Sequence, residues 1–264
     1  MDSERFEKAK KLEEDGRTED ALREYTAMAL EAVDHDEKAA LLANELKCLC
    51  RLGQLDKAEG ALAQIRELPL RDPYVRLVVD FGEACLTALI QQPEAAASKF
   101  KAILDSNREL LAGPEQRDLY EGIQERRAFE LVRLEKYDEA LPILKEALSF
   151  TGEESDQQFV QFYLGVCYAA ASDPNLAKES FLHAIRLGLD SQFEASARYR
   201  LARLYFNSGA FAQAKFHLES ALLVSEGVAD LELKRDIYRS LSRTCHFLGE
   251  EHEERKYTKL GQSI

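Results

Sequence analysis

The sequence has no tryptophan and is poor in residues that interrupt helices, with 13 glycines and 6 prolines among 264 residues. Segments in which β-branched residues alternate with polar ones are missing, so the sequence offers no strand candidates. Long segments rich in Ala, Leu, Glu, Lys and Arg take their place, and these residues favour helices. Hydrophobic residues make up 45% and charged residues 31%. This balance predicts an all-α globular protein with ample material for a core.

Positive charge is also in short supply. Lys and Arg number 35 against 48 Asp and Glu, which gives a formal net charge of −13 at pH 7. Nucleic acids and anionic membranes attract basic surfaces, so we expect no nucleic acid and no membrane among the partners. Neither a signal peptide nor an apolar run near 18 residues is present, which favours a cytoplasmic location.

The sequence lacks the motifs of common catalytic sites. Phosphate-binding glycine loops, HExxH and GxSxG are absent. The five cysteines show no CxxC spacing, and Cys48 and Cys50 point about 200° apart on a helix, so they cannot share a metal. The acidic run at 250–254 is interpreted as plain surface, with weak attraction of a cation as the alternative. We therefore expect no enzyme activity, no cofactor, no metal site, and free thiols in a reducing compartment.

What the sequence does contain is an internal repeat of small and large apolar residues. In the clearest unit, Gly165 is followed twelve residues later by the anchor Ala177, and then by Phe181 and Ala184 on the same helix face. The same template recurs along the chain, mostly at steps of about 37 residues. The equivalent anchors are Ala21, Ala58, Ala96, Ala140, Ala214 and, with the small residues lost, Glu254.

Glycine marks a turn inside these units. Gly16, Gly53, Gly209 and Gly249 each stand five residues before an anchor. Glycine readily adopts the left-handed conformation that ends a helix. Each unit is therefore predicted to be a helix, a tight turn and a second helix, with small residues that let the two helices cross closely.

This pattern resembles the tetratricopeptide repeat family, which pairs helices through a signature of small, aromatic and small residues. Gly165, Tyr168, Ala177, Phe181 and Ala184 match that signature, as does the segment YDEALPILKEAL at 137–148. The resemblance covers the whole chain in about seven repeats and implies a right-handed superhelical solenoid of about 14 helices. The chain departs from the family in its longer period, its missing tryptophan and its weak third and seventh units. The polar last helix is interpreted as a solubilising cap.

The repeats predict a single domain over residues 1–264. A longer connection at 105–118 contains Gly113 and Pro114, which favour a bend. It allows a subdivision into N-terminal repeats at 1–104 and C-terminal repeats with the cap at 119–264.

The resemblance implies that the first helix of each pair lines a concave groove in which peptides bind. Counting back from the anchors places arginines and aromatic residues on this inward side of the C-terminal repeats. The candidate partner-binding residues are Arg126, Phe129, Arg133, Phe159, Phe162, Tyr163, Tyr199, Arg200, Arg203, Phe206, Asn207, Arg239 and Arg243. Arginine captures carboxylates and stacks on aromatic rings, so a protein or peptide ligand with acidic or aromatic residues is expected. Alternatively, the aromatics pack between helices and the arginines pair with nearby glutamates.

The leading hypothesis is a non-catalytic scaffold or adaptor that binds a peptide or helix in the groove. One alternative is a structural component that self-associates or docks laterally, through its convex face or the apolar segment at 75–90. Another is a repeat-based regulatory protein or co-chaperone. Chaperone-tail binding is disfavoured because the carboxylate clamp that the resemblance implies is mostly missing: Asn44 occupies one position, and the others hold Phe6, Lys10, Val78 and Gly82. The partner's identity and the oligomeric state stay open.

Overall fold

The computed structural model describes residues 3–150, 157–226 and 230–264. Throughout these ranges the regular structure is helical, without a strand, which confirms the predicted all-α repeat fold. The chain divides into two compact units, Met1–Lys136 and Tyr137–Ile264. Across the residues that the structure describes, no helix is both long and apolar enough to cross a bilayer.

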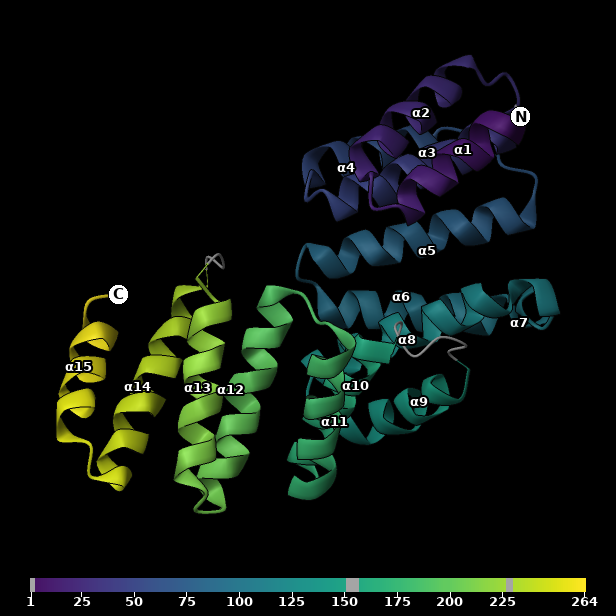
Figure 1. Cartoon of the computed structure of the whole chain (residues 1–264). Coiled ribbons are helices and arrows are strands. Elements are labelled where there is room, and N and C mark those ends of the chain that lie inside the picture. Colours follow the sequence, from purple (N-terminus) through teal and green to yellow (C-terminus); the bar gives the residue numbers. More distant parts are fainter. Residues whose placement is uncertain (1–2, 151–156, 227–229) are drawn as a thin grey trace. The chain divides into compact units, whose positions relative to one another are not determined.

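The first unit stacks helices that follow one another in the chain (Figure 1). They are α1 (Ser3–Glu14), α2 (Thr18–Glu31), α3 (His35–Arg51), α4 (Leu55–Arg66), α5 (Pro73–Leu89), α6 (Pro93–Ser106), the short α7 (Arg108–Leu111), the 3-10 helix η1 (Pro114–Gln116) and α8 (Arg117–Arg133). The connection at 105–118 lies inside this unit, where α6 packs directly on α8. A subdivision of the array at this connection stays a prediction.

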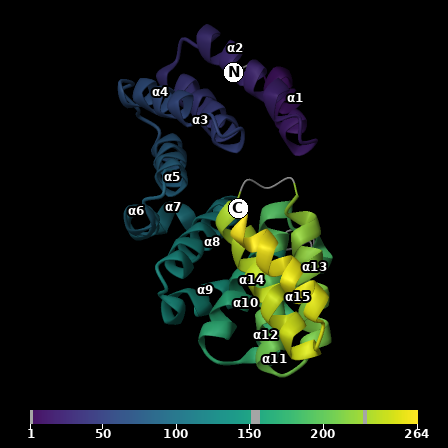
Figure 2. The ribbon, with the colours of Figure 1, turned by 90° about the vertical axis from the view of Figure 1, so that its left-hand side faces the viewer.

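The second unit is a stack of the same kind, and Figure 2 shows its last helices side by side. Its helices are α9 (Tyr137–Phe150), α10 (Gln158–Ala170), α11 (Pro174–Leu187), α12 (Ser191–Asn207), α13 (Phe211–Val224), α14 (Leu231–Leu248) and α15 (Glu251–Gln262). Each helix packs on its neighbours in sequence, as repeat arrays do. The polar α15 buries Tyr257, whose hydroxyl donates to Glu219 of α13 over 3.1 Å.

The anchor alanines lie at the centre of this packing. All six of them are fully buried, and the large residues four positions later, such as Tyr25, Phe100 and Phe181, are fully buried as well. Gly165 shows why small residues are needed: a Cβ atom there would lie 2.7 Å from Cδ1 and Cε1 of Phe181. The crossing of α10 and α11 therefore depends on the missing side chain.

The turn before each anchor adopts the same left-handed conformation in every unit. The predicted glycines have positive φ angles between 68° and 76° at Gly16, Gly53, Gly209 and Gly249. In the units without a glycine, Gln91, Glu135 and Ser172 take its place with φ angles of 58°, 58° and 60°. These residues also stand five positions before their anchors, so the turn is conserved in geometry where the sequence signal is absent.

The apolar segment at 75–90 forms most of α5 and contributes to the core. Val75, Leu77, Val79 and Leu86 are buried, and Leu89 at the end of the helix is exposed. Lateral docking through this segment, which the sequence allowed as an alternative, stays a prediction.

Candidate functional site

A cleft of about 330 Å³ opens between α12 and α14, with α13 behind it. Ala202, Leu218 and Thr244 are buried at its base. The remaining lining residues belong to α12 and α14, and they are Tyr199, Arg203, Phe206, Asn207, Ser240 and Arg243. Their spacing of three or four residues along each helix puts them on one face. We call this cleft and these residues the arginine cleft.

Two arginines of the cleft lie against aromatic rings. The Arg243 guanidinium lies 4.6 Å from the centroid of Phe206, and that of Arg203 lies 5.9 Å from the centroid of Tyr199. Neither arginine forms an ion pair with any residue that the structure describes. By contrast, Arg198 of the same helix binds Glu194 over 2.6 Å. The cleft thus holds cations that are stacked on rings and not neutralised by carboxylates.

Arg200 adds a third cation on α12 beside the cleft. Its side chain is exposed and has no ion pair among the described residues. The surrounding protein atoms lower the pKa of Arg200 by displacing hydrating water, and repulsion from Arg203 lowers it further. Nearby Tyr137, Tyr199 and Tyr163 oppose this effect. Water still reaches the guanidinium, so Arg200 keeps its charge and its capacity to bind an anion.

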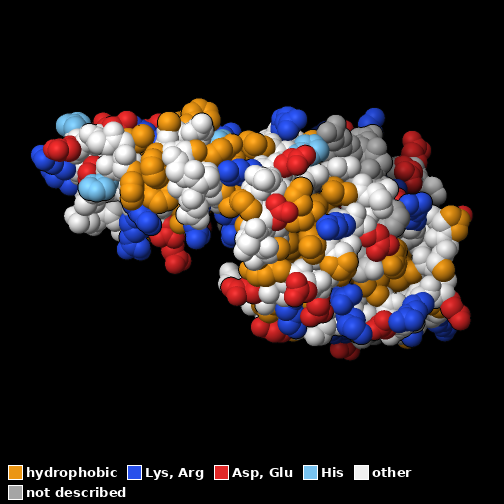
Figure 3. Space-filling model, turned by 90° about the horizontal axis from the view of Figure 1, so that it is seen from below, with side chains coloured by type: hydrophobic (Ala, Val, Ile, Leu, Met, Phe, Trp, Pro, Cys, Tyr) orange, Lys and Arg blue, Asp and Glu red, His pale blue; other side chains and the backbone are white. Residues whose placement is uncertain are grey.

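An aromatic cluster, in which Phe206 and Phe211 are half-buried and Phe247 is exposed, continues the cleft toward the turns that follow α12 and α14. The ring centroid of Phe206 lies 5.2 Å from that of Phe211 and 5.3 Å from that of Phe247, and those of Phe211 and Phe247 are stacked 4.9 Å apart. Phe247 is 53% exposed. The view from below in Figure 3 shows hydrophobic side chains among charged ones at these helix ends. Sequence reasoning missed Phe211 because only first helices were considered; its place two residues after Gly209 was the available signal.

The predicted aromatic floor on α10 is mostly core. Phe162 is only 5% exposed, and its ring packs 5.9 Å from Phe181 and 5.2 Å from Phe193. Phe159 and Tyr163 are half-buried against the same Phe193, at 5.0 and 6.2 Å. The prediction that Phe162 lies open in the groove is therefore wrong, because Phe193 in the first turn of α12 covers it.

The candidates on α8 belong to the first unit. Phe129 is half-buried and Arg126 is exposed. The Arg133 guanidinium donates to the backbone carbonyl of Ala88 over 3.2 Å and to both carboxylate oxygens of Glu130, at 3.2 and 2.9 Å. Glu130 is buried, which raises its pKa, and the charge of Arg133 opposes that rise. Arg133 thus serves as a counter-ion inside the fold, as the alternative interpretation of the arginines supposed.

Arg239 lies on α14 outside the arginine cleft. Its guanidinium is 3.5 Å from Asp236, and it borders a separate hollow between α14 and α15. Two basic residues of α3 in the first unit are also engaged in ion pairs. The carboxylate of the buried Glu13 lies 2.5 Å from Lys47 and 2.8 Å from Arg51, so these cations neutralise a buried acid.

In the described ranges, no three His, Cys, Asp or Glu side chains gather to hold a metal ion. The five cysteines are free. Burial raises the pKa of the Cys48, Cys167 and Cys245 thiols to about 11, so they stay protonated near neutral pH.

Residues 195–227, which span most of α12 and all of α13, match the tetratricopeptide repeat family. No curated protein matches the sequence. Among solved structures, NprR in complex with its cognate peptide NprX has 17% identity and a TM-score of 0.68, covering 98% of this chain and 77% of its own. A Rap protein complexed with competence and sporulation factor has 18% identity and a TM-score of 0.64, covering 86% and 66%. PilF of Pseudomonas aeruginosa has 15% identity and a TM-score of 0.60, covering 85% and 90%.

Proposed function

We propose that this chain, a helical repeat protein with the tetratricopeptide fold, is a non-catalytic interaction scaffold or adaptor. In this proposal the arginine cleft binds a peptide or helix of a partner protein. The observation that carries it is the pair Arg203 and Arg243, which line the cleft without an ion pair among the described residues. In a chain with a net charge of −13, carboxylates are abundant, yet they do not neutralise these cations.

The cleft is suited to an acidic ligand. A guanidinium binds a carboxylate through two parallel hydrogen bonds, and this geometry is stronger and more specific than a single contact. Arg200 and Arg203 repel one another, so an anion between them removes an unfavourable interaction as well as adding a favourable one. Arg243 is held against Phe206, which reduces the conformational entropy that binding costs.

The aromatic cluster, whose Phe247 is exposed, is suited to an apolar or aromatic side chain of the same ligand. Covering a large apolar side chain contributes about 1.5–3 kcal/mol. Aromatic residues and arginine are enriched among the residues that dominate binding at interfaces. The ligand that fits both parts has an acidic residue near a large apolar one.

Similar structures support a role in binding proteins or peptides. NprR was solved with a peptide and a Rap protein with competence and sporulation factor. Those ligands belong to those proteins, and their chemistry is not carried over to this chain. A cytoplasmic setting, in which the five free cysteines stay reduced, is part of the proposal.

Reversing the charge of Arg203 tests whether partners bind in the arginine cleft. Proteins retained by the full-length wild-type chain are identified by mass spectrometry beside those retained by Arg203→Glu and by Arg186→Glu. Arg186 is the matched control, because it is an exposed arginine on α11, outside the cleft and without an ion pair in the described structure. The partners are expected to be lost with Arg203→Glu and kept with Arg186→Glu. If a folded Arg203→Glu chain retained the same partners, binding in the arginine cleft would be contradicted.

A second candidate function is lateral docking through the outward face of α13. Phe216 and Leu223, seven residues apart on that helix, are both exposed. Substitution of both by Ser distinguishes the two functions, because lateral docking would be lost while ligand binding in the cleft would persist.

A further inference from the structure

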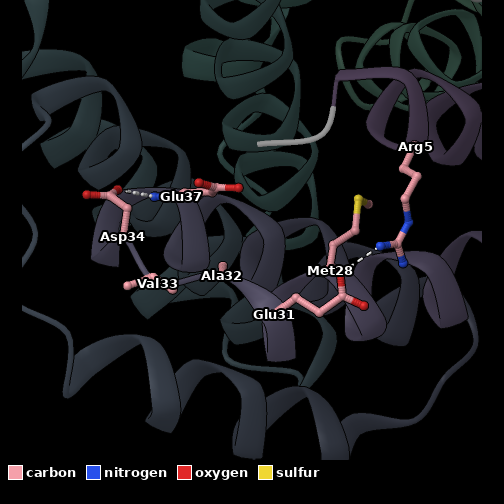
Figure 4. A pocket seen from close by; sticks show the side chains of 7 residues that line it. All are labelled: Arg5, Met28, Glu31, Ala32, Val33, Asp34 and Glu37. Carbon is pink, nitrogen blue, oxygen red and sulfur yellow. Dashed lines mark hydrogen bonds and ion pairs between the residues drawn. The ribbon is translucent and has the colours of Figure 1, made fainter.

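A second hollow lies in the first unit, where α2 ends and α3 begins. Its volume is about 590 Å³, and it is lined by Arg5, Met28, Glu31, Ala32, Val33, Asp34 and Glu37 (Figure 4). We call it the acidic hollow. It is formed by α1, α2, α3 and the loop between the last two, and it shares no residue with the arginine cleft.

Two apolar side chains stand open to solvent at this hollow. Val33 in its lining is 93% exposed and Leu30, in the preceding turn of α2, is 79% exposed. Among the described residues they are the two most exposed large hydrophobic side chains. The buried face of α2 is formed by Ala21, Tyr25, Met28 and Ala29, so Leu30 points away from the core. Single exposed apolar residues are common, but two of them three residues apart, one of which lines a hollow, favour a contact surface.

The charge around the hollow is negative. The lining contains the carboxylates of Glu31, Asp34 and Glu37 and one cation, Arg5, whose guanidinium binds the Glu31 carboxylate over 2.7 Å (Figure 4). Asp34 caps α3 by accepting a hydrogen bond from the backbone N–H of Glu37 over 2.9 Å. Within the lining, carboxylates therefore outnumber cations by three to one. This arrangement is electrostatically complementary to a cation.

We propose that the acidic hollow docks a segment of a partner protein in which a large apolar side chain stands next to lysine or arginine. The apolar side chain covers Leu30 and Val33, while the cation meets the carboxylates of Glu31 and Glu37. Complete burial of one such apolar side chain contributes about 1.5–3 kcal/mol, and a cation next to it adds specificity. A second copy of this chain is a poor occupant because two chains of net charge −13 repel one another.

A randomised library of 12-residue displayed peptides, selected on the full-length chain, tests the inference. We expect one class of enriched peptides to share an apolar residue beside Lys or Arg, distinct from the acidic peptides that the arginine cleft would select. A labelled synthetic copy of the best peptide is then titrated by fluorescence anisotropy into the wild type, Leu30→Ser/Val33→Ser and Glu31→Gln/Glu37→Gln. Each double variant is expected to bind at least about tenfold more weakly, which corresponds to about 1.4 kcal/mol.

Two matched controls separate this surface from others. Leu223→Ser removes an exposed leucine of the second unit, and Arg203→Glu disables the arginine cleft. Both variants are expected to bind the selected peptide like the wild type. The proposal for the arginine cleft and the proposal for the acidic hollow are therefore tested by different variants. A selected pool without peptides that combine an apolar residue with Lys or Arg, or binding of such a peptide that Leu30→Ser/Val33→Ser leaves unchanged, would overturn the inference. Light scattering that shows a wild-type dimer, dissolved by that variant, would overturn it in favour of a second copy.

Discussion

At the scale of single residues, the repeat depends on backbone conformation more than on residue type. The position five residues before the anchor is left-handed in every unit, whether it holds Gly209 or Ser172. A residue with a Cβ atom adopts that conformation at a cost of about 1–2 kcal/mol, because the Cβ approaches its own carbonyl oxygen. Three units therefore carry local strain that the surrounding helix pair compensates.

Replacing Ser172 by glycine is expected to stabilise the chain. Glycine removes the strain at a φ angle of 60° but increases the entropy of the unfolded chain. The net gain in free energy of unfolding is expected to be about 0.5–1 kcal/mol. Urea denaturation measures it, with Gly209→Ser as the reverse control, for which a loss of similar size is expected. A Ser172→Gly chain that unfolds at lower urea would contradict the strain at this turn.

Gly165 and Gly60 provide a matched pair for the role of small residues. Both lie inside helices, but a Cβ at Gly165 would meet Phe181, whereas no heavy atom lies within 4 Å of a Cβ at Gly60. Gly165→Ala is expected to destabilise the chain by about 1–3 kcal/mol because the helices must separate. Gly60→Ala is expected to stabilise it by up to about 1 kcal/mol through helix propensity. Equal effects of the two substitutions in thermal unfolding would argue against the close crossing of α10 and α11.

At the scale of elements, helix α13 carries a buried histidine whose protonation affects the stability of the fold. His217 is 8% exposed and stacks on Tyr205, with ring centroids 5.3 Å apart and planes 3° apart. Burial, followed by the charge of Arg198, lowers the pKa of His217 to about 4. The unfolded chain therefore takes up a proton at this side chain at a higher pH than the folded chain does.

This difference predicts a loss of stability in mild acid. The contribution of neutral His217 is fully present above pH 6.5 and is lost as the pH falls from 6.5 toward about 4. The loss amounts to roughly 3 kcal/mol across that range. Urea denaturation at pH 7 and at pH 5 measures it, and His217→Asn is expected to show a smaller difference between the two. A pH dependence that is the same in the variant would assign the effect to other groups.

The elements also show which parts of the candidate site a sequence can predict. Tyr199, Arg203, Phe206, Asn207 and Arg243 were placed on one inward face by helical spacing, and the structure brings all five into one cleft. Spacing along a helix follows from its own periodicity. The covering of Phe162 by Phe193 could not be predicted, because it depends on how far the first turn of α12 extends over α10.

The same distinction applies to the arginines. Periodicity places Arg133 and Arg203 on the predicted inward side of their helices, seven and eleven residues before the anchors Ala140 and Ala214, but it does not show which of them has a carboxylate within reach. Arg133 binds Glu130 three residues earlier on its own helix, whereas Arg203 finds Tyr199 instead. Whether such an arginine forms an ion pair therefore depends on which side chain lies one helical turn before it and on how deeply that side chain is buried.

At the scale of the whole molecule, the net charge of −13 conceals two surfaces of opposite preference, one in each unit. We propose that the arginine cleft attracts carboxylates and that the acidic hollow attracts cations. In this proposal the chain holds two different partner segments, as an adaptor does.

Salt is expected to weaken binding at the arginine cleft. Raising the ionic strength from 0.1 M to 1 M shortens the screening length from about 10 Å to about 3 Å. The affinity for an acidic, aromatic-containing partner segment should therefore fall steadily with salt, and the fall should be smaller in Arg203→Gln, which removes one positive charge without reversing it. Calorimetric titration over this range measures both. Affinity that rises with salt would show that apolar burial alone drives the interaction.

Site-specific photo-crosslinking locates the surface at which a partner protein binds. A photoreactive amino acid is placed in the full-length chain at Asn207, inside the arginine cleft, or at Gln213, on the exposed side of α13. We expect a partner protein to be captured from position 207 and not from position 213. We also expect Arg243→Glu to abolish the capture. Capture from position 213 alone, or equally from both, would contradict the cleft as the binding surface.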